Sequence, residues 1–204
     1  MDRTHFNNIL STIKKPDVFF DVGVATNNTE AWWAHESWNG VDIFGFEPCE
    51  RRHRELFNYP DRLRKMAVTD TVGKFRGHMN QYDFKINAEI DENDPYTDSI
   101  VESTTIDELD EVHGPFDNIF IWADIEGGEL HLLKGATKVL SEKRVIGLNL
   151  ELWANPPVDG WPTCDEIVNY LNEFDYSIAF GERDDYESWD RNSQQDFLFL
   201  PNES

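Results

Sequence analysis

The chain has 204 residues, of which 39% are hydrophobic and 13% aromatic, so it can bury the core of one domain and is not a wholly disordered chain. Its 40 acidic residues outnumber its 18 basic residues and give a formal net charge of −22, which argues against nucleic acid or an anionic membrane surface as a partner. Adaptation to high salt and simple solubility are both open explanations of this excess.

No stretch is apolar for long enough to span a bilayer, and the first residues lack the pattern of a signal peptide. The two cysteines, Cys49 and Cys164, form no paired motif that would indicate a disulfide framework or a zinc site. We therefore expect a cytoplasmic protein with a single domain over residues 1–204, which begins with an amphipathic helix within residues 1–15.

The stretch over residues 18–28 is the one around which the chain is organised. An apolar run ends in Asp21 and Gly23, and a turn leads to a helix expected over residues 29–37, which Asn27 would cap. A strand, a glycine turn and a helix N-terminus together form a nucleotide or anion site. Asp21 would repel a pyrophosphate but would pair with a cationic amine, which favours S-adenosylmethionine over a dinucleotide.

The rest of the chain alternates between expected strands and helices. Apolar runs predict strands at residues 41–46, 65–68, 74–79, 118–123, 145–152, 176–180 and 196–200, and helical spacing and capping boxes predict helices at 48–57, 105–113, 129–140 and 163–174. Residues 83–98 are polar and acidic and read as a surface loop, so residues 83–103 are a candidate lid or substrate loop. A calcium loop is excluded there, because Pro95 and Tyr96 occupy positions that need an oxygen ligand and a glycine.

This alternation indicates an α/β fold with a doubly wound, mostly parallel sheet and helices on both faces. Ligands bind beyond the carboxyl ends of the strands in such sheets, and most of the polar residues expected there are acids. Glu47 ends the second strand, where an acid accepts the ribose hydroxyls of a bound nucleoside. The alternative is that each acid is only a polar residue that ends a strand. The absence of a GxGxxG pattern counts against a dinucleotide.

Several stretches, in this order and spacing, resemble the FkbM family of methyltransferases. They are Phe20-Asp21-Val22-Gly23, Phe46-Glu47-Pro48, Ala67-Val68-Thr69-Asp70, Thr105-Ile106-Asp107-Glu108-Leu109 and, most specifically, Asp124-Ile125-Glu126-Gly127-Gly128-Glu129-Leu130 followed by Leu133-Lys134-Gly135-Ala136. The resemblance covers about residues 17–152, and Asp196-Phe197-Leu198-Phe199 is similar to the family's closing strand.

The resemblance implies a Rossmann-like methyltransferase fold that uses S-adenosylmethionine, commonly to methylate a hydroxyl of a sugar or related metabolite. It implies cofactor-binding roles for Asp21, Gly23 and Asn27 in the turn, Glu47 at the ribose, Asp70 at the adenine and Asp124 near the methionine part. Glu126 and Glu129 belong to the family signature, the stretch from Asp124 to Leu130, and either could have only a structural role.

The chain departs from the family pattern in two places near the expected site. Asn27 stands where a second glycine is usual, and Trp122-Ala123 replaces the lysine common before the signature aspartate. A non-catalytic binding or assembly protein that retains the fold is therefore the alternative hypothesis, and an enzyme of nucleotide sugars or dinucleotides is a weaker third one.

Methyl transfer to a hydroxyl needs a base beside the acceptor. Asp124 and Glu151 are the preferred candidates for this catalytic role, ahead of Glu126 and His131, and no group of histidines has the spacing of metal ligands. The acceptor is expected to be a small molecule or a glycan. Three tryptophans expected in loops, Trp153, Trp161 and Trp189, could stack on a sugar, and packing within the protein explains them about equally well.

Overall fold

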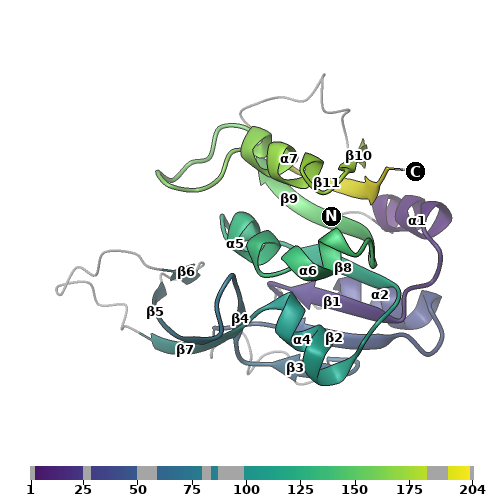
Figure 1. The fold of residues 1–204 in the computed structure, drawn as a ribbon, viewed down its shortest axis with the longest axis horizontal. Coiled ribbons are helices and arrows are strands. Elements are labelled where there is room, and N and C mark those ends of the chain that lie inside the picture. The colour runs from purple at the N-terminus through teal and green to yellow at the C-terminus, as the bar shows by residue number, and fades with distance from the viewer. Residues whose placement is uncertain are drawn as a thin grey trace.

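The computed structural model describes residues 3–24, 29–49, 59–79, 84–86, 99–182 and 193–202, with the backbone alone at residues 75–79, 84–86 and 99–100. The expected Asn27 cap, the helix over residues 50–57 and Trp189 lie outside these ranges. Within them, a seven-stranded sheet runs in the order β10-β11-β9-β8-β1-β2-β3, and only β11 is antiparallel to its neighbours (Figure 1). Its strands are β1 (Val18–Val22), β2 (Asp42–Phe46), β3 (Arg62–Arg64), β8 (Ile119–Ala123), β9 (Val145–Trp153), β10 (Tyr176–Gly181) and β11 (Gln194–Pro201).

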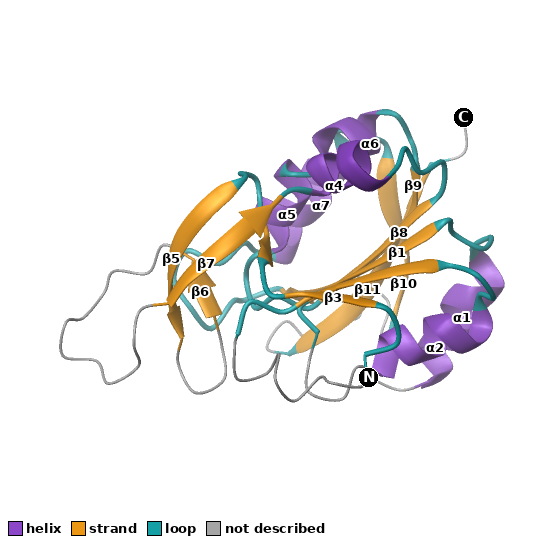
Figure 2. Ribbon diagram, turned by 90° about the horizontal axis from the view of Figure 1, so that it is seen from below, coloured by secondary structure: helices purple, strands orange, loops and turns teal. Residues whose placement is uncertain are grey.

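Helices cover both faces of this sheet, which confirms the predicted doubly wound α/β fold (Figure 2). One face carries α1 (Arg3–Thr12) and α2 (Thr29–Ser37), and the other carries α4 (Ile106–His113), α5 (Glu129–Lys134), α6 (Thr137–Ser141) and α7 (Cys164–Asn172). None of the described helices combines the length and the hydropathy of a membrane span.

The central strands are apolar on both faces, and this gives the domain two cores. Alternate residues of β1 illustrate the division: Phe20 packs with Phe44 on the side of α4 to α7, whereas Phe19 packs with Phe120 on the side of α1 and α2. Of the tryptophans in and after α2, Trp38 belongs to the second core and is 6% exposed, while Trp32 is 39% exposed.

A smaller four-stranded sheet extends from the edge of the domain, and here two predictions were wrong. Its strands are β4 (Ala67–Val68), β7 (Ser99–Thr104), β5 (Gly73–Met79) and β6 (Phe84–Ile86), in that order. Of the strand predicted over 65–68, only residues 67–68 form a strand, which pairs with β7, and the strand that pairs with β2 lies over residues 62–64, before the predicted range. Arg62 and Arg64 lie on an exposed edge, so β3 lacks the apolar pattern of a buried strand.

The surface loop predicted over residues 83–98 was also wrong in part, and a role of residues 83–103 as a lid or substrate loop stays a prediction. Residues 84–86 form β6 and residues 99–103 belong to β7, and both are strands of the smaller sheet, while 87–98 lie outside the described ranges. The polarity of the segment concealed these strands, because a sheet outside the main core needs little continuous apolar sequence.

Asp107 explains why the helix predicted over 129–140 is divided into α5 and α6. Its backbone N–H donates to the carbonyl of Gly135 at 2.9 Å, and its carboxylate accepts the N–H groups of Lys138 and Val139 at 2.9 and 3.1 Å. Ala136, the N-cap residue just before α6, has no side chain that could make this cap. Asp107 thus caps α6 from α4.

Replacing Asp107 with alanine should lower the free energy of unfolding by about 1–2 kcal/mol, because two helix N–H groups lose their acceptor. Urea denaturation followed by circular dichroism measures the change. Glu111→Ala removes an exposed acid from the same helix and serves as the control; equal stability of the two variants would contradict the capping role.

Candidate active site

Gly23 holds three strand ends together at the carboxyl edge of the sheet. It has a φ of +86°, and a Cβ there would lie 1.9 Å from the carbonyl oxygen of Asp124, so no other residue fits. The Gly23 N–H donates to the Phe46 carbonyl at 2.9 Å, and the Asp124 N–H donates to the Val22 carbonyl at 3.1 Å. The ends of β1, β2 and β8 therefore meet, and they bring Asp21, Glu47 and Asp124 to one place.

Asp21 is 4% exposed and faces inward from β1. One of its carboxylate oxygens accepts a hydrogen bond from the Tyr59 hydroxyl at 2.9 Å, and Gly45 leaves room for that ring, because a Cβ at Gly45 would lie 2.4 Å from it. Burial raises the pKa of Asp21 to about 8, and the charge of Glu30 adds to this effect. Sequence reasoning missed Tyr59; the glycine beside Asp21 in β2 was the only signal of it.

Glu47 is 2% exposed and lies just beyond β2. Its carboxylate accepts the N–H of Cys49 at 2.7 Å, and its own N–H donates to the Arg64 carbonyl at 3.0 Å. The charges of Glu47 and Asp124 both contribute to the raised pKa of Asp21, which is consistent with the three carboxyl groups lying near one another.

Asp70, the cofactor residue predicted at the adenine, is paired with a histidine of α5. Its carboxylate lies 2.9 Å from Nδ1 of His131 on α5 and 2.8 Å from the Thr71 hydroxyl. Burial alone would raise the pKa of Asp70, but these hydrogen bonds outweigh it and lower the pKa. The pair joins the turn after β4 to α5 and uses the side chain of His131, so the adenine contact of Asp70 stays a prediction.

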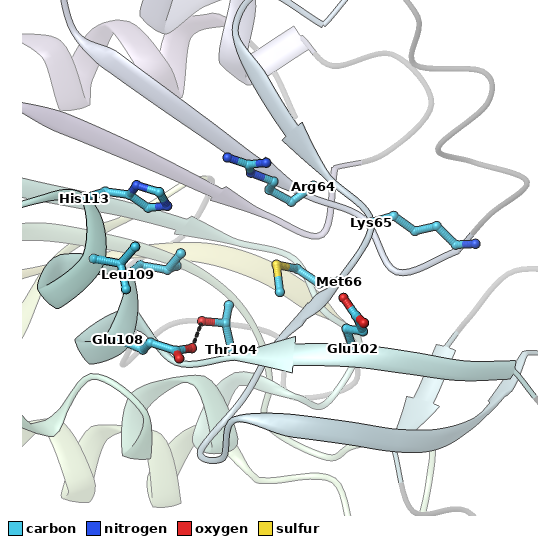
Figure 3. A pocket seen from close by; sticks show the side chains of 9 residues that line it. Arg64, Lys65, Met66, Glu102, Thr104, Glu108, Leu109 and His113 are labelled. Carbon is cyan, nitrogen blue, oxygen red and sulfur yellow. Dashed lines mark hydrogen bonds between the residues drawn. The ribbon is translucent and has the colours of Figure 1, made fainter.

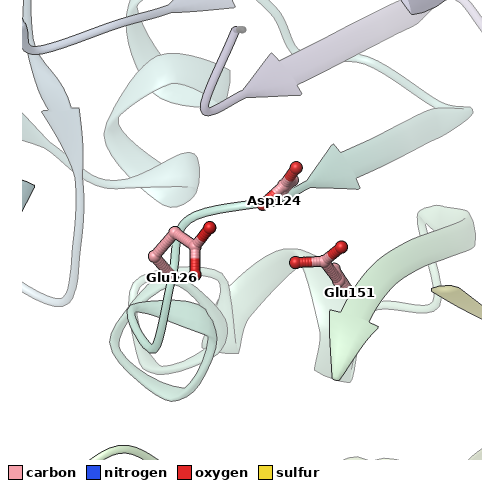
Figure 4. A group of neighbouring side chains, drawn as sticks. All are labelled: Asp124, Glu126 and Glu151. Atoms are coloured by element: carbon pink, nitrogen blue, oxygen red, sulfur yellow. The ribbon is translucent and has the colours of Figure 1, made fainter. Parts of the chain in front are cut away.

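Three carboxylates converge at the carboxyl ends of β8 and β9 (Figure 4). Oxygens of Asp124, Glu126 and Glu151 lie within 4.8 Å of one another. Such a cluster is common without an ion, so its spacing by itself identifies no metal. Burial and the charges of Asp124, Asp196 and Glu126 raise the pKa of Glu151 to about 9, and a hydrogen bond with Asp124 contributes. At neutral pH, Asp124 and Glu151 therefore hold one proton between them.

Glu129, the other signature acid, has a structural position. It is 4% exposed, and its side chain accepts the N–H of Ile125 at 3.3 Å, which fixes the turn before α5. Burial raises the pKa of Glu129 to about 8. Glu126 occupies that turn with a φ of 50° and directs its carboxylate toward Glu151 (Figure 4).

Two neighbours of Glu151 were missed from the sequence. Asp196 on β11 lies opposite Glu151 in register, and Gln194 donates to an oxygen of Glu151 at 3.0 Å. Only the antiparallel pairing of β11 with β9 brings them there, and no local spacing reveals that pairing. The ring of Trp161 packs against Gly127 in the signature turn, beside these acids.

A separate pocket of about 430 Å³ opens between α4, the smaller sheet and the end of β3 (Figure 3). Arg64, Lys65 and His113 line it together with Glu102 and Glu108, and Glu108 accepts a hydrogen bond from Thr104 at 2.6 Å. Its walls carry both signs of charge and include none of the acids at the strand ends, so it is distinct from the candidate active site.

The family model described as the methyltransferase FkbM domain matches residues 21–178. The chain belongs to this family. The match confirms the resemblance, and it contains Asp21, Glu47, Asp124 and Glu151 but not Asp196. A search of curated proteins finds no match.

Two solved structures are similar to this chain, and the first supports the fold. The methyltransferase FkbM from Methylobacillus flagellatus KT is 16% identical with a TM-score of 0.57, and the match covers 95% of this chain and 50% of that one. This chain thus spans half the length of that relative. The magnesium protoporphyrin IX methyltransferase from Synechocystis PCC 6803, solved with bound S-adenosylmethionine, is 9% identical with a TM-score of 0.47, and the match covers 98% of this chain and 81% of that one.

The raised pKa values predict a protein that is more stable in mild acid than in mild base. Asp21 and Glu129 have a pKa of about 8 in the folded state, so above pH 5 the folded state binds more protons than the unfolded state. Stability should fall by roughly 1 kcal/mol per pH unit for each group as the pH rises from 5 to 8. Thermal unfolding between pH 5 and 9 measures this loss of stability.

The double variant Asp21→Asn with Glu129→Gln should reduce the slope of this dependence, because Glu151 and Asp196 still contribute to it, whereas Asp42→Asn, which alters an exposed acid, should leave the slope unchanged. A double variant with the slope of the native protein would show that the two buried acids do not cause it.

Proposed function

We propose that this protein is an S-adenosylmethionine-dependent methyltransferase that transfers a methyl group to a hydroxyl of a sugar, a glycan or a related small metabolite. The observation that carries the proposal is the meeting of Gly23 with the backbone of Asp124. It lies between β1 and β8, where the strand order reverses, and ligands of doubly wound sheets bind in the crevice at this point.

The charge of the site fits this cofactor. Buried or partly buried carboxyl groups raise one another's pKa values, so a cationic ligand would relieve their repulsion. S-adenosylmethionine carries a sulfonium and an ammonium group. Asp21 and Asp124 would hold these positive charges, and Glu47 would accept hydrogen bonds from the ribose hydroxyls. A dinucleotide would instead place its pyrophosphate among these acids.

When bound, S-adenosylmethionine supplies an electrophilic methyl group: its bond to sulfur breaks, the electron pair stays on sulfur, and the methyl bonds to the acceptor oxygen. The protein orients the acceptor and receives the hydroxyl proton. We assign this step to the carboxylate of the Asp124 and Glu151 pair, because a pair that holds one proton at neutral pH can accept a second.

The same acids limit the acceptor. The acceptor side of the site, where the methyl acceptor would bind, is surrounded by four acids: Asp124, Glu126, Glu151 and Asp196. A phosphate or a carboxylate would be repelled there. A neutral hydroxyl can donate to a carboxylate there. A neutral polyol or sugar therefore suits the site better than a sugar acid or sugar phosphate.

Calorimetric titration with S-adenosylmethionine tests the cofactor. Glu47→Gln keeps an oxygen for the N–H of Cys49 but loses the charge, so the dissociation constant should rise about 10-fold or more. Glu173→Gln on the exposed end of α7 is the matched control. Absence of binding to folded native protein would contradict the proposal and favour a non-catalytic binding protein with the same fold.

Incubation with methyl-labelled S-adenosylmethionine and matched acceptors tests the proposed preference for a neutral acceptor. Label should pass to neutral sugars and not to the corresponding uronic acids or sugar phosphates. Preferential labelling of the anionic members would show that the acids do not select the acceptor.

A further inference from the structure

A chain of buried hydrogen bonds leads from α1 to the acceptor side of the site. Nε2 of His5 lies 2.8 Å from Oδ1 of Asn149, and Nδ2 of Asn149 donates to Oδ1 of Asp196 at 2.7 Å. His5, Asn149 and Asp196 are 2%, 0% and 6% exposed. Because the amide nitrogen faces Asp196, the amide oxygen accepts from His5, and His5 Nε2 carries the hydrogen.

The sheet places this series of hydrogen bonds beside Glu151. Asn149 and Glu151 are two residues apart on β9 and so face the same side, and Asp196 is the register partner of Glu151 on β11. Gln194 on the same strand donates to Oε1 of Glu151, which leaves the other oxygen of Glu151 to carry a proton.

We propose that His5, Asn149 and Asp196 form a positioning relay that holds a carboxylate beside Glu151, so that Glu151 keeps the proton it shares with Asp124 and Asp124 is the ionised carboxylate. Asp196 is the register partner of Glu151, whereas Asp124 follows β8, which does not pair with β11. The inference rests on the proposed function in one respect: it identifies Asp124 as the base that receives the hydroxyl proton.

The order of ionisation supports the relay. Burial and the charges of Asp124 and Glu182 raise the pKa of Asp196 to about 7, and the hydrogen bond from Asn149 opposes them. Glu151 is less buried, yet its pKa is about 9, and the charge of Asp196 contributes to that value. Asp196 therefore ionises first and keeps Glu151 protonated.

The titratable groups around this pair come from five places in the fold. Asp124 follows β8, Glu126 lies in the turn before α5, Asp196 is on β11, Glu182 follows β10, and His5 is on α1. All of these side chains but His5 are acids, so Asn149 donates the hydrogen bond that holds Asp196 as a carboxylate, and His5 orients Asn149.

Carbon-13 NMR of the side-chain carboxyl groups tests the relay in the full chain without cofactor or acceptor. Glu151→Gln identifies the Glu151 signal by its loss. Asp196→Asn removes the neighbouring charge, and Asn149→Leu removes the donor that keeps Asp196 ionised. Each should lower the titration midpoint of Glu151 by at least ~1 pH unit. His5→Gln, which can still donate to Asn149, should preserve the native midpoint better than His5→Leu does.

Tyr176→Phe is the matched control, because it removes a buried hydrogen bond of 2.9 Å to Val145 in the same sheet without changing a charge. It should leave the Glu151 midpoint in place. An unchanged midpoint in folded Asp196→Asn, or a shift in that variant with none in folded Asn149→Leu, would overturn the relay. If Asn149→Leu does not fold, Asp196→Asn and the two His5 variants decide. The titration involves no methyl transfer, so failure of the relay and failure of the proposed function are separate results.

Discussion

The site depends on the contact between Gly23 and the backbone of Asp124. At a distance that excludes any Cβ, the end of β1 lies against the residue that follows β8, and hydrogen bonds join Gly23 to β2 and Asp124 to β1. Apart from Asp70, the acids assigned to the cofactor or the acceptor lie at the ends of β1, β2 and β8, on β9 beside β8, or on β11 beside β9. A glycine with a left-handed φ thus sets the positions of charged side chains that are far apart in the sequence.

The acids that this contact gathers destabilise the fold that holds them. Asp21, Glu129, Glu151 and Asp196 all have raised pKa values, chiefly because they are buried. Each would ionise more easily in the unfolded chain, so the folded protein carries electrostatic strain at neutral and basic pH. A cationic cofactor that binds only the folded state would offset part of that strain, which couples its binding to the stability of the domain.

The sequence was most informative where local pattern decides structure. Apolar runs predicted β1, β8 and β9 well, because buried parallel strands are apolar on both faces, and the Thr163 capping box correctly marked the start of α7. The strand-end acids Asp21, Glu47, Asp124 and Glu151 followed from the same reasoning. Tyr59, Asn149 and Asp196 did not, because partners across a sheet are set by register and topology. Neither β3 nor β7 has an apolar signal that separates it from a surface loop.

The reversed direction of β11 has a consequence for how the site forms. Asp196 reaches Glu151 only when β11 has inserted between β9 and β10, and His5 reaches Asn149 only when α1 has packed on the same face. Residues 5 and 196 must therefore both be in place before the acid pair has its full surroundings. A nascent chain that has formed β1, β2, β8 and β9 would already have the cofactor side of the crevice. The acceptor side would mature last, in a contact of high sequence separation that closes the sheet.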